Sequence, residues 1–228
     1  MGPVSRRRDA LVSRRHSPPA PLVLISGGGS GVGLACARAL AARNVRLLLC
    51  DCDGAALSRA SAELGASTTF CEVTAESSVA IFAKDVIDRY SDVDVLINAA
   101  GDGYVRALGM MRITLAFLPA MRRSKMPKLI FNVAPDFDPP EQGEALFPNV
   151  ASPRNFRRLS ASLAVQTRGS AVRVVTIMPR RKMGAPHGAA IGTKCDPADV
   201  VAAVTFAILG KGAPDAAPRV ALARARRG

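Results

Sequence analysis

A glycine-rich stretch near the start of the chain has the residue types and spacing of a phosphate site. Gly27, Gly31 and Gly33 lie between an apolar run, 22–26, and a helical pattern, 32–43. Because glycine has no Cβ, the backbone can turn sharply here, and its N–H groups can approach a phosphate at the positive end of the following helix. The stretch therefore predicts a site for the pyrophosphate of a dinucleotide.

An acidic residue follows at the distance that the ribose of such a ligand requires. Asp51 comes at the end of a second apolar run, 46–50, about twenty residues after the glycine turn. A carboxylate at the end of the second strand can accept hydrogen bonds from ribose hydroxyls. The turn and the carboxylate together favour nucleotide binding over a turn that is merely structural.

The length and composition indicate one α/β domain. The chain has 228 residues, of which 49% are apolar and only 4% aromatic, with no Trp. This composition suits a sheet of Val, Ile and Leu covered by Ala-rich helices. There is no apolar run long enough to span a membrane, and five cysteines without a Cys-x-x-Cys pair indicate reduced thiols in the cytoplasm.

The net charge of +13 comes mostly from the two ends of the chain. Residues 1–16 contribute +4 and residues 219–228 contribute another +4, which leaves +5 for the body. We expect a basic, disordered tail over 1–21, a folded domain over 22–210 and a basic C-terminal segment over 211–228. The Arg-rich start leaves organelle targeting open as an alternative to the cytoplasm.

Apolar patterning alternates between strand and helix from Leu22 onward, which predicts a parallel sheet with right-handed crossovers. In the third helix, Ile81, Val86, Ile87 and Tyr90 are expected to face the core. The expected strands are 22–26, 46–50, 67–72, 93–98, 128–133, 171–177 and a short last one at 219–222, and the expected helices are 32–43, 54–64, 77–90, 106–123, 153–167 and 197–209.

Five motifs in this order resemble the short-chain dehydrogenase/reductase family. They are Ser26–Gly33, Asp51, Cys71–Thr74, Asp94–Gly101 and Leu118–Met121. The resemblance runs from about Leu22 to Leu209 and implies a Rossmann-like, doubly wound parallel sheet in a single domain.

The resemblance also implies which residues would hold a cofactor. The pyrophosphate would be contacted by Gly27, Ser30, Gly31, Val32 and Gly33, and the adenosine ribose by Asp51. The adenine would be flanked by Glu72 and Val73. The second ribose would lie over Asn98, Ala99, Ala100 and Gly101. A carboxylate at Asp51 repels a 2′-phosphate, and neither Ser30 nor Cys52 is a basic residue that could offset this repulsion. NAD is therefore favoured over NADP. No metal site is expected.

The family's catalytic residues do not survive in the same alignment. Pro135 stands at the Ser position, Asn149 at the Tyr position and Pro153 at the Lys position. Arg106 replaces the Asn of the preceding helix. An amide and two prolines cannot cycle a proton near neutral pH, so we expect an NAD(H)-binding protein that is impaired or inactive in the family's hydride transfer, with no catalytic residue assigned.

Other interpretations stay open at this point. Tyr104 with Lys182 could supply substitute acid–base groups for an active oxidoreductase, and the basic run Arg180–Lys182 could hold phosphate. The Arg tails could bind polyanions without specificity. Family members often dimerise through the helices expected here at 106–123 and 153–167, but arginines load both helices with positive charge.

Overall fold

A computed structural model describes residues 20–101, 103–134, 153–177, 202, 205 and 220–222. The strands are β1 (Leu22–Ser26), β2 (Arg46–Asp51), β3 (Ser67–Phe70), β4 (Val95–Asn98), β5 (Lys128–Val133), β6 (Val172–Ile177) and β7 (Val220–Leu222). The helices are α1 (Gly31–Ala41), α2 (Gly54–Leu64), α3 (Glu76–Tyr90), α4 (Gly103–Arg123) and α5 (Pro153–Gln166). The expected helix at 197–209 lies almost wholly outside the described residues.

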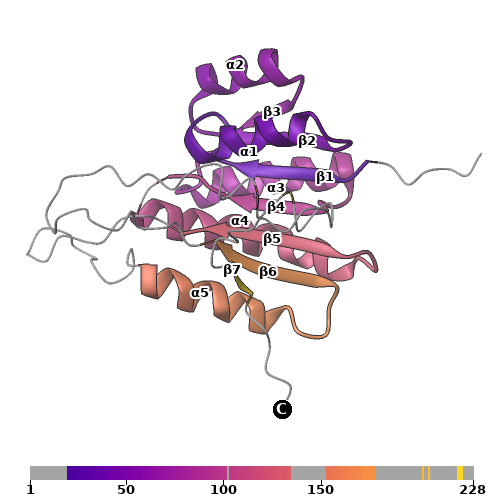
Figure 1. Cartoon of the computed structure of the whole chain (residues 1–228), viewed down its shortest axis with the longest axis vertical. Coiled ribbons are helices and arrows are strands. Elements are labelled where there is room, and N and C mark those ends of the chain that lie inside the picture. The colour runs from indigo at the N-terminus through magenta and orange to yellow at the C-terminus, as the bar shows by residue number, and fades with distance from the viewer. Residues whose placement is uncertain are drawn as a thin grey trace, which may run out of the picture.

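The strands form one sheet in the order β3-β2-β1-β4-β5-β6-β7, and Figure 1 shows them following one another from α2 at one end to α5 at the other. From β3 to β6 every neighbouring pair is parallel, whereas β7 pairs antiparallel with β6. The expectation of a parallel sheet is therefore confirmed for six strands, and the short last strand, for which no direction was predicted, runs antiparallel. Successive strands are added on one side of β1 up to β3 and on its other side from β4 onward. Ligands bind in such folds at this change of side, between β1 and β4.

Helices cover the sheet on both faces. On one face, α1 and α2 bury side chains such as Leu40 and Leu57 against β1 and β2. On the other face, α3 and α4 pack side chains such as Phe82 and Phe117 against the same strands and β4. A third cluster, built around Phe156, joins α5 to α4. This is the doubly wound arrangement that the alternation of strands and helices predicts.

Several boundaries differ from those expected. Strand β3 ends at Phe70 rather than at 72, because its neighbour β2 ends at Asp51 and offers no further partner. Helix α4 begins at Gly103 rather than at 106, and α5 ends at Gln166 rather than at 167.

The expected buried stripe of α3 is wrong at one position. Ile81 is 72% exposed, whereas Val79, Phe82, Ala83 and Val86 are the buried residues of the helix. These four follow the i, i+3, i+4, i+7 spacing of a helix face, and Ile81 falls outside that spacing.

Candidate functional site

The glycine turn after β1 is closed by backbone contacts that leave no room for side chains. Gly27 has φ of 74°, and the N–H groups of Gly27 and Gly28 donate to the Cys50 carbonyl at 2.8 and 3.1 Å. A Cβ on Gly33 would lie 2.1 Å from the Gly27 carbonyl oxygen. The first turn of α1 therefore packs directly on the strand end, as a phosphate-binding turn requires.

The N-terminal end of α1 retains free hydrogen-bonding capacity. Ser30 is the N-cap residue, but its side chain makes no capping hydrogen bond. Ser30 and Gly31 are both exposed, and the space where a Cβ on Gly31 would point is open. The first N–H groups of a helix have no partner within the helix. This end therefore fits an anionic group such as a pyrophosphate.

Asp51 is held at the edge of this turn. One carboxylate oxygen, Oδ2, accepts from Gly29 N–H at 3.0 Å, and the other, Oδ1, accepts from Asp53 N–H at 3.2 Å. Asp53 in turn caps α2 by accepting from Ala56 N–H at 2.9 Å. The side chain of Asp51 is thus oriented between two helix starts while remaining partly exposed, which suits an acceptor of ribose hydroxyls.

The loop after β3 starts beside Asp51, whose backbone carbonyl accepts from Cys71 N–H at 2.9 Å. Glu72 accepts from the backbone N–H and the hydroxyl of Thr74 at 2.9 and 2.7 Å, and these bonds lower the pKa of Glu72. Val73 is 5% exposed and touches the position where Gly109 of α4 has no side chain. The side chain of Val73 therefore faces the core, so an adenine could be flanked only by the backbone there.

The sequence did not predict how the cysteines near Asp51 meet. Cys50 and Cys71 are both buried. A hydrogen bond between the two thiols raises the pKa of Cys50 and lowers that of Cys71. Cys52 is exposed, and its pKa is raised by burial and by the charge of Asp51. A raised pKa keeps the Cys52 thiol protonated, so it adds no charge beside the carboxylate.

Asn98 is the last residue of β4 and stands in register with Ser26, the last residue of β1. Its side chain is buried, and its Nδ2 donates to Thr114 Oγ1 at 3.0 Å and to Asn132 Oδ1 at 2.9 Å. Asn132 Nδ2 donates to Ser160 Oγ at 2.8 Å, and Ser160 Oγ lies 2.5 Å from Thr176 Oγ1. The Oδ1 atom of Asn98 has no hydrogen-bond partner among the described residues.

This buried polar row joins helices α4 and α5 through the sheet. Asn98, Asn132 and Thr176 stand in register on β4, β5 and β6. Sequence reasoning missed the row, although a polar residue near the carboxyl end of three successive apolar strands was a visible signal. Because the Asn98 side chain is buried, only its backbone could run beneath a ribose, as expected for this segment.

We expect Asn132→Leu to destabilise the protein by about 2–3 kcal/mol, because Asn98 Nδ2 and Ser160 Oγ would each lose a buried partner. Urea unfolding followed by circular dichroism measures the change. Asn44→Ala, a change outside any secondary structure, serves as the control. A loss below about 0.5 kcal/mol for Asn132→Leu would show that the row contributes nothing to stability.

The segment after β4 makes a second tight turn beside the first. A Cβ on Gly27 would lie 2.6 Å from the Ala100 Cα, so the two turns touch at the point between β1 and β4. Gly101 has φ of 72°, and its carbonyl accepts from Arg106 Nε at 2.8 Å. Arg106, which is expected from the sequence to stand at the family's Asn position, therefore holds the turn in place.

The positions aligned with the family's catalytic residues, and those of the possible substitutes, fall mostly outside the described residues. Pro135, Asn149 and the run Arg180–Lys182 lie in undescribed segments. Pro153 is the first residue of α5 and Tyr104 lies in the first turn of α4, but neither side chain is described. The helix expected to carry the family's Tyr and Lys positions starts at Pro153, and proline is favoured at the first helical position.

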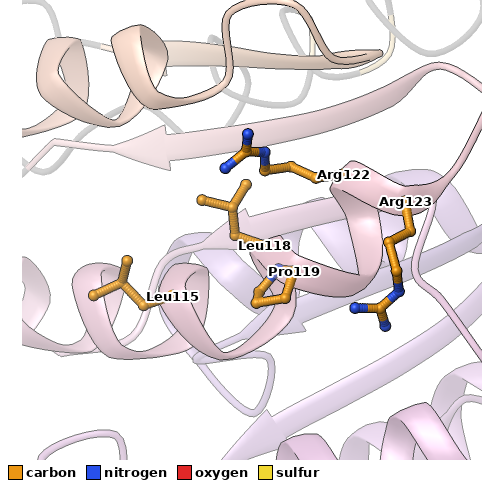
Figure 2. A pocket seen from close by; sticks show the side chains of 5 residues that line it. All are labelled: Leu115, Leu118, Pro119, Arg122 and Arg123. Carbon is orange, nitrogen blue, oxygen red and sulfur yellow. The ribbon is translucent and has the colours of Figure 1, made fainter.

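The described cavities lie away from the two glycine turns. One, of about 420 Å³, is on the outer surface of α4 (Figure 2). Another, of about 310 Å³, lies at the amino ends of β1 and β2, where Arg46 and Tyr90 are among its lining residues. No cluster of potential metal ligands occurs among the residues described. The helices in the described ranges include none with the length and apolar character to cross a bilayer.

Comparison with known proteins agrees with the geometry. Residues 21–181 match the family model described as short chain dehydrogenase. L-fucose dehydrogenase from Bos taurus is 27% identical over 177 residues, which are 69% of this chain and 64% of that protein. The first curated relatives are matched over about a third to two thirds of their own length.

Two solved structures show the same fold. A metagenomic short-chain oxidoreductase in complex with NADP is 25% identical, with a TM-score of 0.65, over 82% of this chain and 91% of that chain. A short chain dehydrogenase/reductase from Burkholderia phymatum in complex with NAD is 21% identical, with a TM-score of 0.62, over 79% of this chain and 77% of that chain.

Proposed function

The chain belongs to the short-chain dehydrogenase family, and from this premise we propose that it binds NAD(H) at the glycine turn but lacks the family's usual route of hydride transfer. The cofactor residues are those named from the sequence, with Val73 and Asn98 contributing backbone only. The observation that carries the binding half is the bond from Gly29 N–H to Asp51, at 3.0 Å, which joins the phosphate turn to the ribose acceptor.

The residues present fit a dinucleotide. The uncapped start of α1 offers N–H groups to the pyrophosphate, and Asp51 offers a partly exposed carboxylate to the adenosine ribose. The turn at Gly101, held by Arg106, supports the second ribose. A bound NAD would supply a nicotinamide that accepts or gives a hydride, and the protein would have to supply the proton.

The proposed loss of activity concerns that proton. A group that moves a proton in the transition state needs a pKa near the working pH. The side chains of Pro135 and Pro153 carry no ionisable group, and the amide of Asn149 does not ionise in the working range. The chain therefore retains a dinucleotide site without the acid–base residues beside it, which is compatible with a sensor or with a subunit of a larger assembly.

Asp51 also supports the choice of NAD over NADP. Relatives in the family bind either cofactor, as the two solved complexes show for their own proteins. Here the carboxylate would face a 2′-phosphate directly, and the neighbouring Cys52 thiol is held in its neutral form. Two like charges at such a distance repel each other, which disfavours NADP.

We expect Asp51→Asn to weaken NADH binding about tenfold, because a hydrogen bond to a charged acceptor is worth about 1.5–3 kcal/mol and the amide keeps part of it. NADPH binding should strengthen at the same time, since the repulsion is removed. Titration of cofactor fluorescence measures both affinities. Asp88→Asn, an exposed change on α3, is the matched control. Unchanged affinities in Asp51→Asn would remove Asp51 from the site.

A further inference from the structure

The outer faces of α4 and α5 carry positive charge without any negative charge. Helix α4 contains four arginines and α5 contains three, and neither helix contains Asp or Glu. The other helices differ: Arg38 of α1 pairs with Glu63 of α2, and α3 contains its own pairs of Lys84 with Asp88 and Arg89 with Asp85. The charge on α4 and α5 therefore has no counterpart on the helices that carry it.

Four of these arginines pair with no carboxylate in the described part of the chain. Arg122, Arg123, Arg157 and Arg158 are all exposed and take part in none of the ion pairs between described residues. Helices α4 and α5 pack side by side through the cluster around Phe156. The exposed arginines therefore lie on two helices that are in contact with each other.

Apolar side chains lie among these charges. Leu115 is 48% exposed on α4, and Val165 is 53% exposed on α5. Figure 2 shows a hollow on α4, where the Arg122 side chain reaches back along the helix toward Leu118. The hollow has a volume of about 420 Å³ and is lined by Leu115, Leu118, Pro119, Arg122 and Arg123. An apolar hollow rimmed by guanidinium groups is complementary to a segment that carries both apolar and acidic side chains.

We propose that this surface docks an acidic protein segment with apolar side chains. The surface, called here the basic face, consists of Leu115, Pro119, Arg122, Arg123, Arg157, Arg158 and Val165. Carboxylates of the partner pair with the guanidinium groups, and one apolar side chain enters the hollow beside Leu115. The inference is independent of cofactor binding, since the basic face lies on the outside of α4 and α5.

A second copy of the chain does not fit the basic face. A two-fold interface brings the same patch of both subunits together. It would set the arginines of α4 and α5 against their own copies with no acidic residue on either helix. Like charges in contact repel each other.

Nucleic acid fits the basic face less well than protein. Single strands are bound by stacking their bases on aromatic side chains. The exposed large apolar residues of α4 and α5 whose side chains are described are Val105, Leu115 and Val165, and none of them is aromatic.

The probe for the test is a fluorescent peptide of about 18 residues with Leu on one helical face and Glu on the other. We expect anisotropy to show saturable binding to the full chain. The double variant Arg122→Glu with Arg123→Glu should weaken binding at least tenfold, because two attractive pairs become repulsive. Leu115→Ser should weaken it about threefold. Arg43→Glu, an exposed change outside the basic face, should have a much smaller effect.

Three further arms make the result decisive. A peptide with Lys in place of Glu should not bind, an oligo-dT of about 20 nucleotides should bind more weakly than the Glu peptide, and the protein should sediment as a monomer. The proposal is overturned if the Glu peptide shows no saturation up to about 500 µM, or if Arg43→Glu weakens it as much as the double variant. It is equally overturned if the protein sediments as a dimer that the double variant dissociates.

Discussion

Gly33→Ala is expected to abolish NADH binding and to destabilise the fold. The new Cβ would lie 2.1 Å from the Gly27 carbonyl oxygen, a backbone atom that cannot move away without opening the turn. We expect a loss of about 2–4 kcal/mol in the free energy of unfolding and a fall of at least about a hundredfold in NADH affinity. Urea unfolding and NADH fluorescence measure the two effects.

Gly54→Ala is the matched control for this change. Gly54 is the first residue of α2, and a Cβ there would meet nothing within 4 Å. Alanine favours helix over glycine, so the control should be neutral or slightly stabilising. NADH affinity in Gly33→Ala within about threefold of the original protein would contradict the placement of the pyrophosphate at this turn.

Lys128→Met is expected to destabilise the protein about as much as Asn132→Leu. Lys128 is only 4% exposed and pairs with Asp92 at 2.6 Å and Asp94 at 2.8 Å. Asp94 also accepts from Leu22 N–H at 2.8 Å, so the three residues tie the starts of β1, β4 and β5 together. Removing the ammonium leaves two carboxylates facing each other, for a loss of about 2–3 kcal/mol, less than in a fully buried pair.

The pH dependence of this contribution follows from the pKa of Lys128. Burial lowers the pKa, but the hydrogen bonds to Asp92 and Asp94 outweigh it and leave the pKa above its ordinary value of 10.5. A raised pKa means that the contribution is complete below that value and is lost as the pH rises through the pKa of the folded protein. The difference between the original protein and Lys128→Met should therefore be constant between about pH 7 and 10 and shrink above that range.

Lys84→Met is the control for the buried pair. Lys84 pairs with Asp88 on the surface of α3, where its side chain is 77% exposed. Such a pair is worth at most about 1 kcal/mol. Equal losses in Lys84→Met and Lys128→Met, measured by urea unfolding, would show that the buried pair has no special role.

The sequence predicted the features that depend on local spacing. The glycine turn, the place of Asp51 at the end of β2 and the alternation of strands and helices are each encoded within about thirty neighbouring residues. The start of α5 at Pro153 follows from the preference of proline for the first helical turn. These features could be inferred without knowing which strands are neighbours.

The features that were missed depend on contacts between distant segments. The row from Asn98 to Thr176 requires the register of three strands, and the pair of Cys50 with Cys71 requires the end point of β3. Ile81 was placed in the core from its spacing to Val86, Ile87 and Tyr90, whereas the position of α3 on the sheet is set by Phe82 and its neighbours. Sheet register and helix rotation are tertiary properties that a single sequence does not specify locally.

The most direct test of the proposed function is a titration of NADH with the protein, in which NADH fluorescence reports binding. A panel of carbonyl compounds is then added, and the NADH concentration is followed over time. We expect saturable binding with a dissociation constant of about 1–100 µM and no loss of NADH beyond that in a sample without protein. No saturation below about 1 mM would contradict the dinucleotide site, and steady consumption of NADH would contradict the loss of hydride transfer.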